Sequence, residues 1–107
     1  MLLDPAGGQV VLSGGGKIAL SSSGNNFVSA ETTVTLTNVN NAIFGAGGIG
    51  VGDDTSLTLV NSGTINANVN TTSGKLEIDL LNPISNAGIM EATTEPADVL
   101  PIVVLKR

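Results

Sequence analysis

Glu77 and Asp79 are the two side chains whose spacing comes nearest to a known kind of catalysis. They alternate with Leu76 and Ile78, so in a strand both carboxylates share one face, about 7 Å apart. One carboxyl acting as acid and the other as base across such a gap is the arrangement of inverting glycoside hydrolysis. A sugar site also needs aromatic platforms and cationic partners, however, and the chain contains no Trp, Tyr or His. We therefore predict that both acids lie on an outer, solvated strand face, and keep a carbohydrate-active β-helix (hydrolase or lyase) as the alternative.

A second candidate is the run from Gly47 to Asp54, GGIGVGDD. It resembles the calcium nonapeptide of some solenoids, in which Gly-rich turns and an Asp hold the ion between successive coils. Here the first Asp comes one residue late, and no second copy follows after nine residues. Since a shared site needs both copies, we interpret the run as a turn and expect no metal ligand at Asp53 or Asp54.

Three weaker patterns also have ordinary explanations. Without His or Cys, no activated Ser or Cys nucleophile can be assembled. The run Gly14-Gly15-Gly16-Lys17 lacks the Ser or Thr that follows the Lys of a phosphate-binding loop. Alternate threonines of segment 33–37, continued by Thr58, form a row of the kind that binds ice, but Glu77 is expected to interrupt it on the third coil. The β-propensity of Thr explains the row, so no catalytic, cofactor-binding or metal-binding residue is predicted.

The composition indicates which elements carry these residues. Apolar residues are 41% of the 107, almost all aliphatic, and Phe27 and Phe44 are the only aromatics. Aliphatics without large rings favour a narrow core of thin layers, and 14 Gly with many Asn and Thr favour strands and turns. The net charge of −5 argues against nucleic acid and anionic membranes, which need a basic face. The first five residues show neither the basic nor the apolar region of a signal peptide.

Apolar residues alternate with period two in short segments bounded by Gly, Asn or Ser, which predicts strands and no helix. Two interleaved families recur: Ile43, Ile65 and Ile89 at 22 and 24 residues, and leucines at 36, 57 and 76 at 21 and 19 residues. Such a period predicts a parallel β-helix (β-solenoid) of about four to five coils. Asn at repeated corners is expected to adopt left-handed backbone angles and to bond to the next coil. An antiparallel sandwich is the alternative.

The register follows from this alignment. We predict one domain over residues 1–107, with repeat coils at 8–92 and a cap or assembly segment at 93–107, because Pro96–Arg107 matches no coil. Thr35, Thr58, Glu77 and Asp79 should face solvent. The residues expected to be buried are Val34, Leu36, Ile43, Leu57, Leu59, Ile65, Leu76, Ile78 and Ile89.

Three segments resemble the repeats of large secreted bacterial proteins: Val10–Gly16, Thr35–Gly50 and Leu57–Ala67. These are the β-strand-repeat proteins, similar to filamentous-haemagglutinin and autotransporter passenger regions. The resemblance covers roughly residues 8–92 and implies a non-catalytic structural or adhesive module, secreted or on the cell surface, with a glycan or other host-surface ligand.

The end of the chain is apolar on both strand faces, and one coil beneath it cannot bury both. We expect a second copy of the chain to cover it, which predicts a homo-oligomer, with a trimer favoured over a dimer. The same feature leaves a small self-assembling structural protein as a further alternative function. The residues expected in this contact are Val99, Leu100, Ile102, Val103, Val104 and Leu105.

Overall fold

The structure, a computed structural model, describes residues 2–21, 26–50, 57–69, 75–93 and 102–106, the last of these as backbone only. Within these residues the chain forms strands and no helix. Sheet 1 contains β1 (Leu2–Leu3), β4 (Phe27–Ala30), β7 (Gly47–Ile49), β10 (Lys75–Asp79) and β13 (Ile102–Lys106). Sheet 2 contains β2 (Gln9–Leu12), β5 (Val34–Asn38), β8 (Leu57–Asn61) and β11 (Ser85–Asn86). Sheet 3 contains β3 (Lys17–Ala19), β6 (Ala42–Phe44), β9 (Thr64–Ala67) and β12 (Ile89–Ala92).

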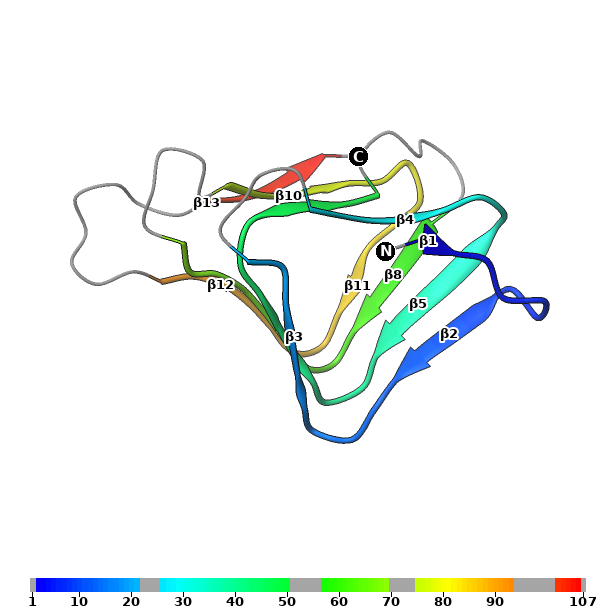
Figure 1. Ribbon diagram of the computed structural model, residues 1–107, viewed down its shortest axis with the longest axis horizontal. Coiled ribbons are helices and arrows are strands. Elements are labelled where there is room, and N and C mark those ends of the chain that lie inside the picture. The colour runs from blue at the N-terminus through cyan, green and yellow to red at the C-terminus, as the bar shows by residue number, and fades with distance from the viewer. Residues whose placement is uncertain (1, 22–25, 51–56, 70–74, 94–101, 107) are drawn as a thin grey trace.

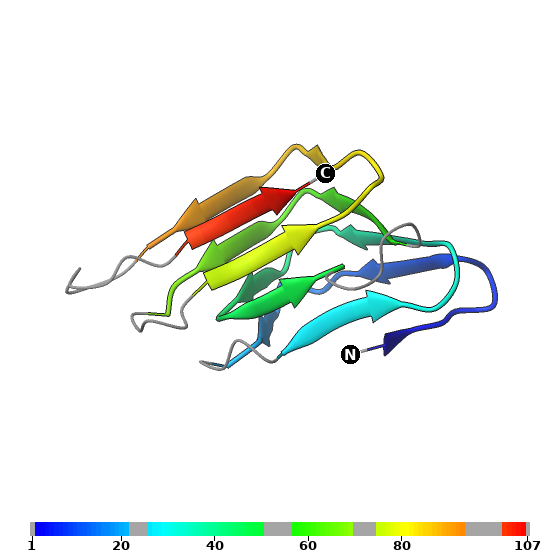
Figure 2. The ribbon, with the colours of Figure 1, turned by 90° about the horizontal axis from the view of Figure 1, so that it is seen from above.

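The three sheets form the sides of a triangular prism, and the chain visits them in the same order in every coil (Figure 1). The described strands pair in parallel, each with the strand one coil away. Seen from above, β4, β7, β10 and β13 lie side by side in sheet 1 (Figure 2). A sandwich built from hairpins would be antiparallel. The predicted all-β parallel β-helix is therefore confirmed, and the sandwich is wrong.

The core consists of columns of aliphatic side chains that run from coil to coil. In sheet 3, Ile18, Ile43, Ile65 and Met90 occupy one register position in successive strands. No coil could bury these side chains alone, but stacking covers Ile43 and Ile65 from both sides and the terminal Ile18 and Met90 from one. Eight of the nine predicted core residues are buried: Val34, Leu36, Ile43, Leu57, Leu59, Ile65, Leu76 and Ile78.

Ile89 is the exception, since it is 53% exposed and the prediction that it is buried is wrong. In β12 it lies opposite Thr64, whereas Met90 lies opposite Ile65. The corner between sheets 2 and 3 shortens along the chain, from four residues after β2 to three after β5 and two after β8 and β11. Because the corner has two residues after both β8 and β11, the position of Ile65 falls on Met90 in the last coil. Matching isoleucine to isoleucine is therefore wrong by one residue, which moves a strand side chain to the opposite face.

The second predicted repeat family is wrong in its second and third members, since Leu57 lies two residues out of register, opposite Val34, and Leu76 lies in another sheet. Leu36 lies opposite Leu59 in sheet 2, but Leu76 belongs to β10 in sheet 1, where it lies opposite Gly47. Sheet 2 continues instead with β11, a two-residue strand that pairs with the end of β8. Leu76 is fully buried, and a buried, alternating strand looks the same in sequence on any side of the prism.

The end of the chain also differs from expectation. Residues Ile102–Lys106 form β13, which pairs with β10 from Lys75↔Ile102 to Asp79↔Lys106. This part of the predicted cap thus continues sheet 1 as a regular solenoid strand, and the expectation that it matches no coil is wrong. Val99 and Leu100 lie outside the described residues.

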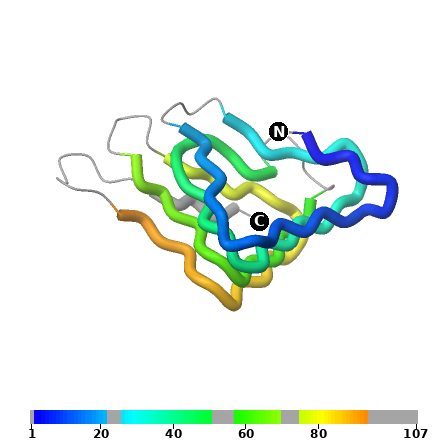
Figure 3. Tube along the Cα trace, turned by 60° about the horizontal axis from the view of Figure 1, so that its bottom comes forward, coloured from blue at the N-terminus to red at the C-terminus, as the bar shows by residue number. Residues whose placement is uncertain are grey.

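Buried asparagines join the corners between sheets 2 and 3, which stack on one another in Figure 3. Asn38, Asn61 and Asn86 occupy one register position. Asn38 Nδ2 donates to Asn61 Oδ1 at 2.8 Å, and Asn61 Nδ2 donates to Asn86 Oδ1 at 2.8 Å. The amide groups also hold the corner backbone, with Asn38 Nδ2 donating to Asn41 O at 2.9 Å and Asn61 Nδ2 to Gly63 O at 3.1 Å. The predicted hydrogen bonds between coils are confirmed, but the left-handed backbone is wrong, since Ser21 is the only described non-Gly residue with positive φ.

Candidate functional site

Glu77 and Asp79 lie on the outer side of β10, opposite in direction to the buried Leu76 and Ile78. Glu77 is nevertheless only 8% exposed, so the prediction that it faces solvent is wrong, and Asp79 is half-buried. The reason is that β10 is flanked by strands on both sides, β7 and β13. Glu77 Oε2 accepts a hydrogen bond from Lys75 Nζ at 2.9 Å. This geometry favours an ion pair within the sheet over a pair of catalytic acids open to a substrate.

The glycine run predicted as a turn begins as a strand, because Gly47, Gly48 and Ile49 form β7. A Cβ at Gly47, whose φ is +135°, would clash with the backbone of Asn26 in the preceding coil. The close approach of two coils therefore explains why glycine is needed here. Asp53 and Asp54 lie outside the described residues. Among the residues that the structure describes, no three His, Cys, Asp or Glu side chains are grouped so that they could hold a metal ion.

The glycines of the Gly14–Lys17 run form the corner between β2 and β3. Gly14 N and Gly15 N both donate to Asn40 Oδ1 at 3.0 Å, and Gly16 N donates to Asn41 Oδ1 at 2.8 Å. The amides that would hold a phosphate in a binding loop are thus occupied by side chains of the next coil.

The threonine row lies on the outer face of sheet 2. Thr35 is opposite Thr58 in register, and both are half-buried. The expectation that Glu77 interrupts this row is wrong, because Glu77 belongs to sheet 1. The first coil places Gln9 beside Thr35 instead, so the threonines form a short patch and not a long array.

A hollow of about 300 Å³ lies on the outer face of sheet 3, and the sequence did not predict it. Register places Lys17, Ala42 and Thr64 in one column across β3, β6 and β9, with Phe44 beside Asn66 in the next column. Ala42 is the small residue of the first column, which leaves space between its larger neighbours. The residues that line the hollow are Lys17, Ala42, Phe44, Thr64, Asn66 and Asn68.

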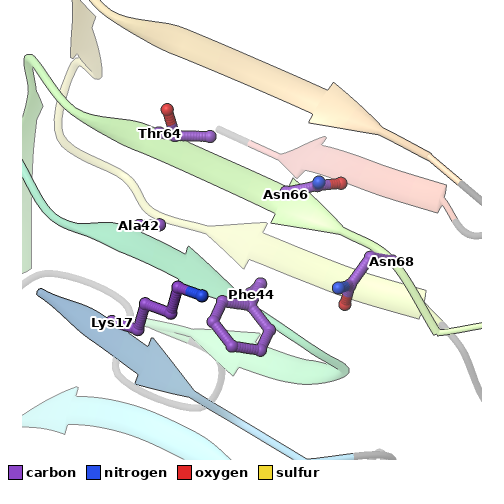
Figure 4. Close-up of a pocket in the computed structure, with 6 residues that line it drawn as sticks. All are labelled: Lys17, Ala42, Phe44, Thr64, Asn66 and Asn68. Atoms are coloured by element: carbon purple, nitrogen blue, oxygen red, sulfur yellow. The ribbon is translucent and has the colours of Figure 1, made fainter.

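The hollow combines an aromatic ring with polar groups. Figure 4 shows the Phe44 ring face-on, with the Lys17 amine on one side and the Asn68 side chain on the other. Asn66 is held in place by Thr93, since its Nδ2 donates to Thr93 Oγ1 at 2.9 Å and its Oδ1 accepts from the same hydroxyl at 3.0 Å. Lys17 is exposed and makes no ion pair within the described part of the chain. Such a set of groups can hold a small polar ligand by stacking, hydrogen bonding and charge.

The sequence contained one signal for this site. Phe44 follows the inward Ile43, so alternation places the ring on the outer face of its strand. The residues of other coils that lie beside Phe44 could not be predicted from the sequence, because strand pairing depends on corner lengths that differ between coils.

Comparison of the chain with protein-family models, with curated proteins and with solved structures gives no match. Among the described residues, no helix is long and apolar enough to cross a membrane.

Proposed function

We propose that this chain is a non-catalytic structural and adhesive repeat module of a secreted or cell-surface bacterial protein. The observation that carries the proposal is the regular stack of three parallel sheets, in which the same register positions are buried in coil after coil. A stack of this kind lengthens by about 4.8 Å per coil and keeps three flat outer faces available along its length. Extension and display need that geometry and no deep pocket.

The outer faces support an adhesive role. Two of them carry neighbouring hydroxyl and amide side chains, such as Thr35 and Thr58 on sheet 2 and Thr64 and Asn66 on sheet 3. Uncharged polar groups can exchange hydrogen bonds with a ligand without the high cost of stripping water from charges. The likeness of segments such as Leu57–Ala67 to secreted bacterial repeats supports the location.

Labelling of intact cells tests the proposal. An antibody against the purified protein is applied to intact and to lysed cells of the source organism, with a cytoplasmic enzyme as control, and the culture medium is assayed in parallel. We expect signal on intact cells or in the medium, removed by external protease. Signal that appears only after lysis, together with the control enzyme, would contradict the proposal.

We also propose that the module forms a homo-oligomer, with a trimer favoured, through segment 99–105. At that end of the prism Ile84 and Met90 are only partly buried against the core, so a second surface there would remove further apolar area from water. Light scattering on the full chain, and on a chain that ends at Asp98, tests this. We expect an oligomer for the first and a monomer for the second, with circular dichroism checking that the sheets persist without β13. A monomeric full-length chain would contradict it.

A further inference from the structure

We propose that the hollow on sheet 3 binds one pyranose ring that carries a carboxylate, an acidic sugar unit. The inference rests on the proposed adhesive function, because it names the ligand class for one of the outer faces. It is argued from three parts of the hollow: a ring, a set of hydrogen-bonding groups and a single cation.

The ring of Phe44 supplies the stacking surface. Phe44 is half-buried on the outer side of β6, and Figure 4 shows its ring face-on between Lys17 and Asn68. The partial negative charge on an aromatic face attracts C–H groups and the positively polarised face of a sugar ring, and the contact also removes apolar area from water.

The hydrogen-bonding groups surround that ring. Thr64 provides a hydroxyl, and Asn66 and Asn68 provide amide groups that can both donate and accept. Because Asn66 is fixed by its two hydrogen bonds with Thr93, little conformational entropy is lost when it binds a ligand. Sugar hydroxyls, which donate and accept, match this mixture better than a purely anionic or purely apolar ligand would.

Lys17 selects an acidic sugar over a neutral one. It is the one described cation that lines the hollow, in a chain whose net charge is −5. Glu91 lies beside Asn66 on the side of the hollow away from Phe44. A bound carboxylate is therefore attracted toward Lys17 and repelled from the β12 side, which fixes the orientation of the ring.

The size of the hollow limits the ligand to one ring. A volume of about 300 Å³ is at the lower end of the range of small-molecule sites. One monosaccharide in an open hollow should bind weakly, with Kd on the order of millimolar. Weak single sites are useful to a repeat protein, because many copies on one surface increase the total avidity.

A titration followed by NMR tests the proposal, with two probes that differ only at C6. Methyl glucuronide carries the carboxylate, and methyl glucoside carries a hydroxymethyl group in its place. We expect shifts of amide resonances in β3, β6 and β9, and about tenfold weaker binding of the glucoside. Phe44→Leu, which keeps apolar packing without a flat ring, should weaken both probes at least fivefold. Lys17→Gln should reduce the affinity for the glucuronide to that for the glucoside.

Val11→Ala on the outer face of sheet 2 is the matched control and should leave both affinities unchanged, since Val11 is 58% exposed and lies outside the hollow. Amide spectra of each unliganded variant verify the fold. The proposal is overturned if shifts are absent or scattered over all three sheets, or if Lys17→Gln leaves the preference for the glucuronide intact. Such a result leaves the labelling of intact cells unaffected, so failure of the sugar site and failure of the surface role are distinguishable.

Discussion

Replacing Asn61 by alanine should destabilise the protein more than any outward-facing substitution in the same sheet. Asn61 is fully buried at the corner after β8. Its Oδ1 accepts from Asn38 Nδ2, and its Nδ2 donates toward the Asn86 side chain and toward the backbone oxygens of Gly63 and Ile89. Alanine removes every one of these contacts and leaves polar groups in three successive coils without this partner.

The expected loss follows from the number of hydrogen bonds. One accepted and two donated bonds, at about 1 kcal/mol each, amount to about 3 kcal/mol of unfolding free energy. For a chain of 107 residues this lowers Tm by at least about 10 °C. Asn86→Ala is the matched control, because Asn86 belongs to the same column but is exposed, and without it Asn61 Nδ2 keeps the backbone oxygens of Gly63 and Ile89 as acceptors. It should cost less than about 1 kcal/mol.

Urea denaturation followed by circular dichroism measures both variants, and an unchanged m-value confirms that the same surface unfolds. The reasoning is refuted if Asn61→Ala costs under about 1 kcal/mol, or no more than Asn86→Ala. Either outcome would mean that the asparagine column does not stabilise the corners and that the aliphatic columns alone hold the coils together.

Three further predictions concern packing and metals. Leu57→Ala should lower the unfolding free energy by about 2–5 kcal/mol, because it truncates a core side chain. Ile89→Ala, on the exposed face, should change it by about 0.5 kcal/mol or less. Equal losses of unfolding free energy in urea denaturation would contradict the register. Gly63→Ala should lower the unfolding free energy by about 1–3 kcal/mol, because the new Cβ would lie 2.7 Å from the buried side-chain amide of Asn38 in the neighbouring coil. Gly7→Ala is the control and should leave the unfolding free energy unchanged in the same assay, since no atom lies within 4 Å of its Cβ position. Calcium should leave Tm unchanged in a thermal melt, because the run at 47–54 cannot supply roughly six to eight oxygen ligands; a rise of many degrees would restore the nonapeptide interpretation.

Much of the fold could be predicted from residue types alone. Alternation around Leu36, Leu57 and Ile78 identified strands and their buried faces, because period two leaves one side chain in two on each face. Recurrence at about two dozen residues then indicated parallel stacking, since only equivalent coils bury equivalent positions. Ile89 was assigned to the wrong face because the alignment matched isoleucines, whereas Met90 takes the position of Ile65. Leu76 was assigned to the wrong sheet because alternation does not show on which side of the prism a buried strand lies.

The candidate site could be predicted only in part. The calcium-like run, the glycine corner and the two acids were visible as spacings, yet Glu77 is covered because strands 29 residues before it and 27 after it flank β10. Likewise, Lys17, Phe44 and Thr64 come from three different coils and share one hollow only through the register.

The sequence by itself determined the class of structure, because hydrophobic alternation and turn residues act locally and specify strands, corners and the inward side of each coil. Only the tertiary structure decided which strands are neighbours. Which strands become neighbours depends on the number of residues in each corner. Close contacts between coils, such as those of Gly63, and the hydrogen bond between Asn38 and Asn61 fix the position of each corner. Lateral neighbours in turn determine which outward side chains are covered and which line a hollow, and the proposed binding face depends on them.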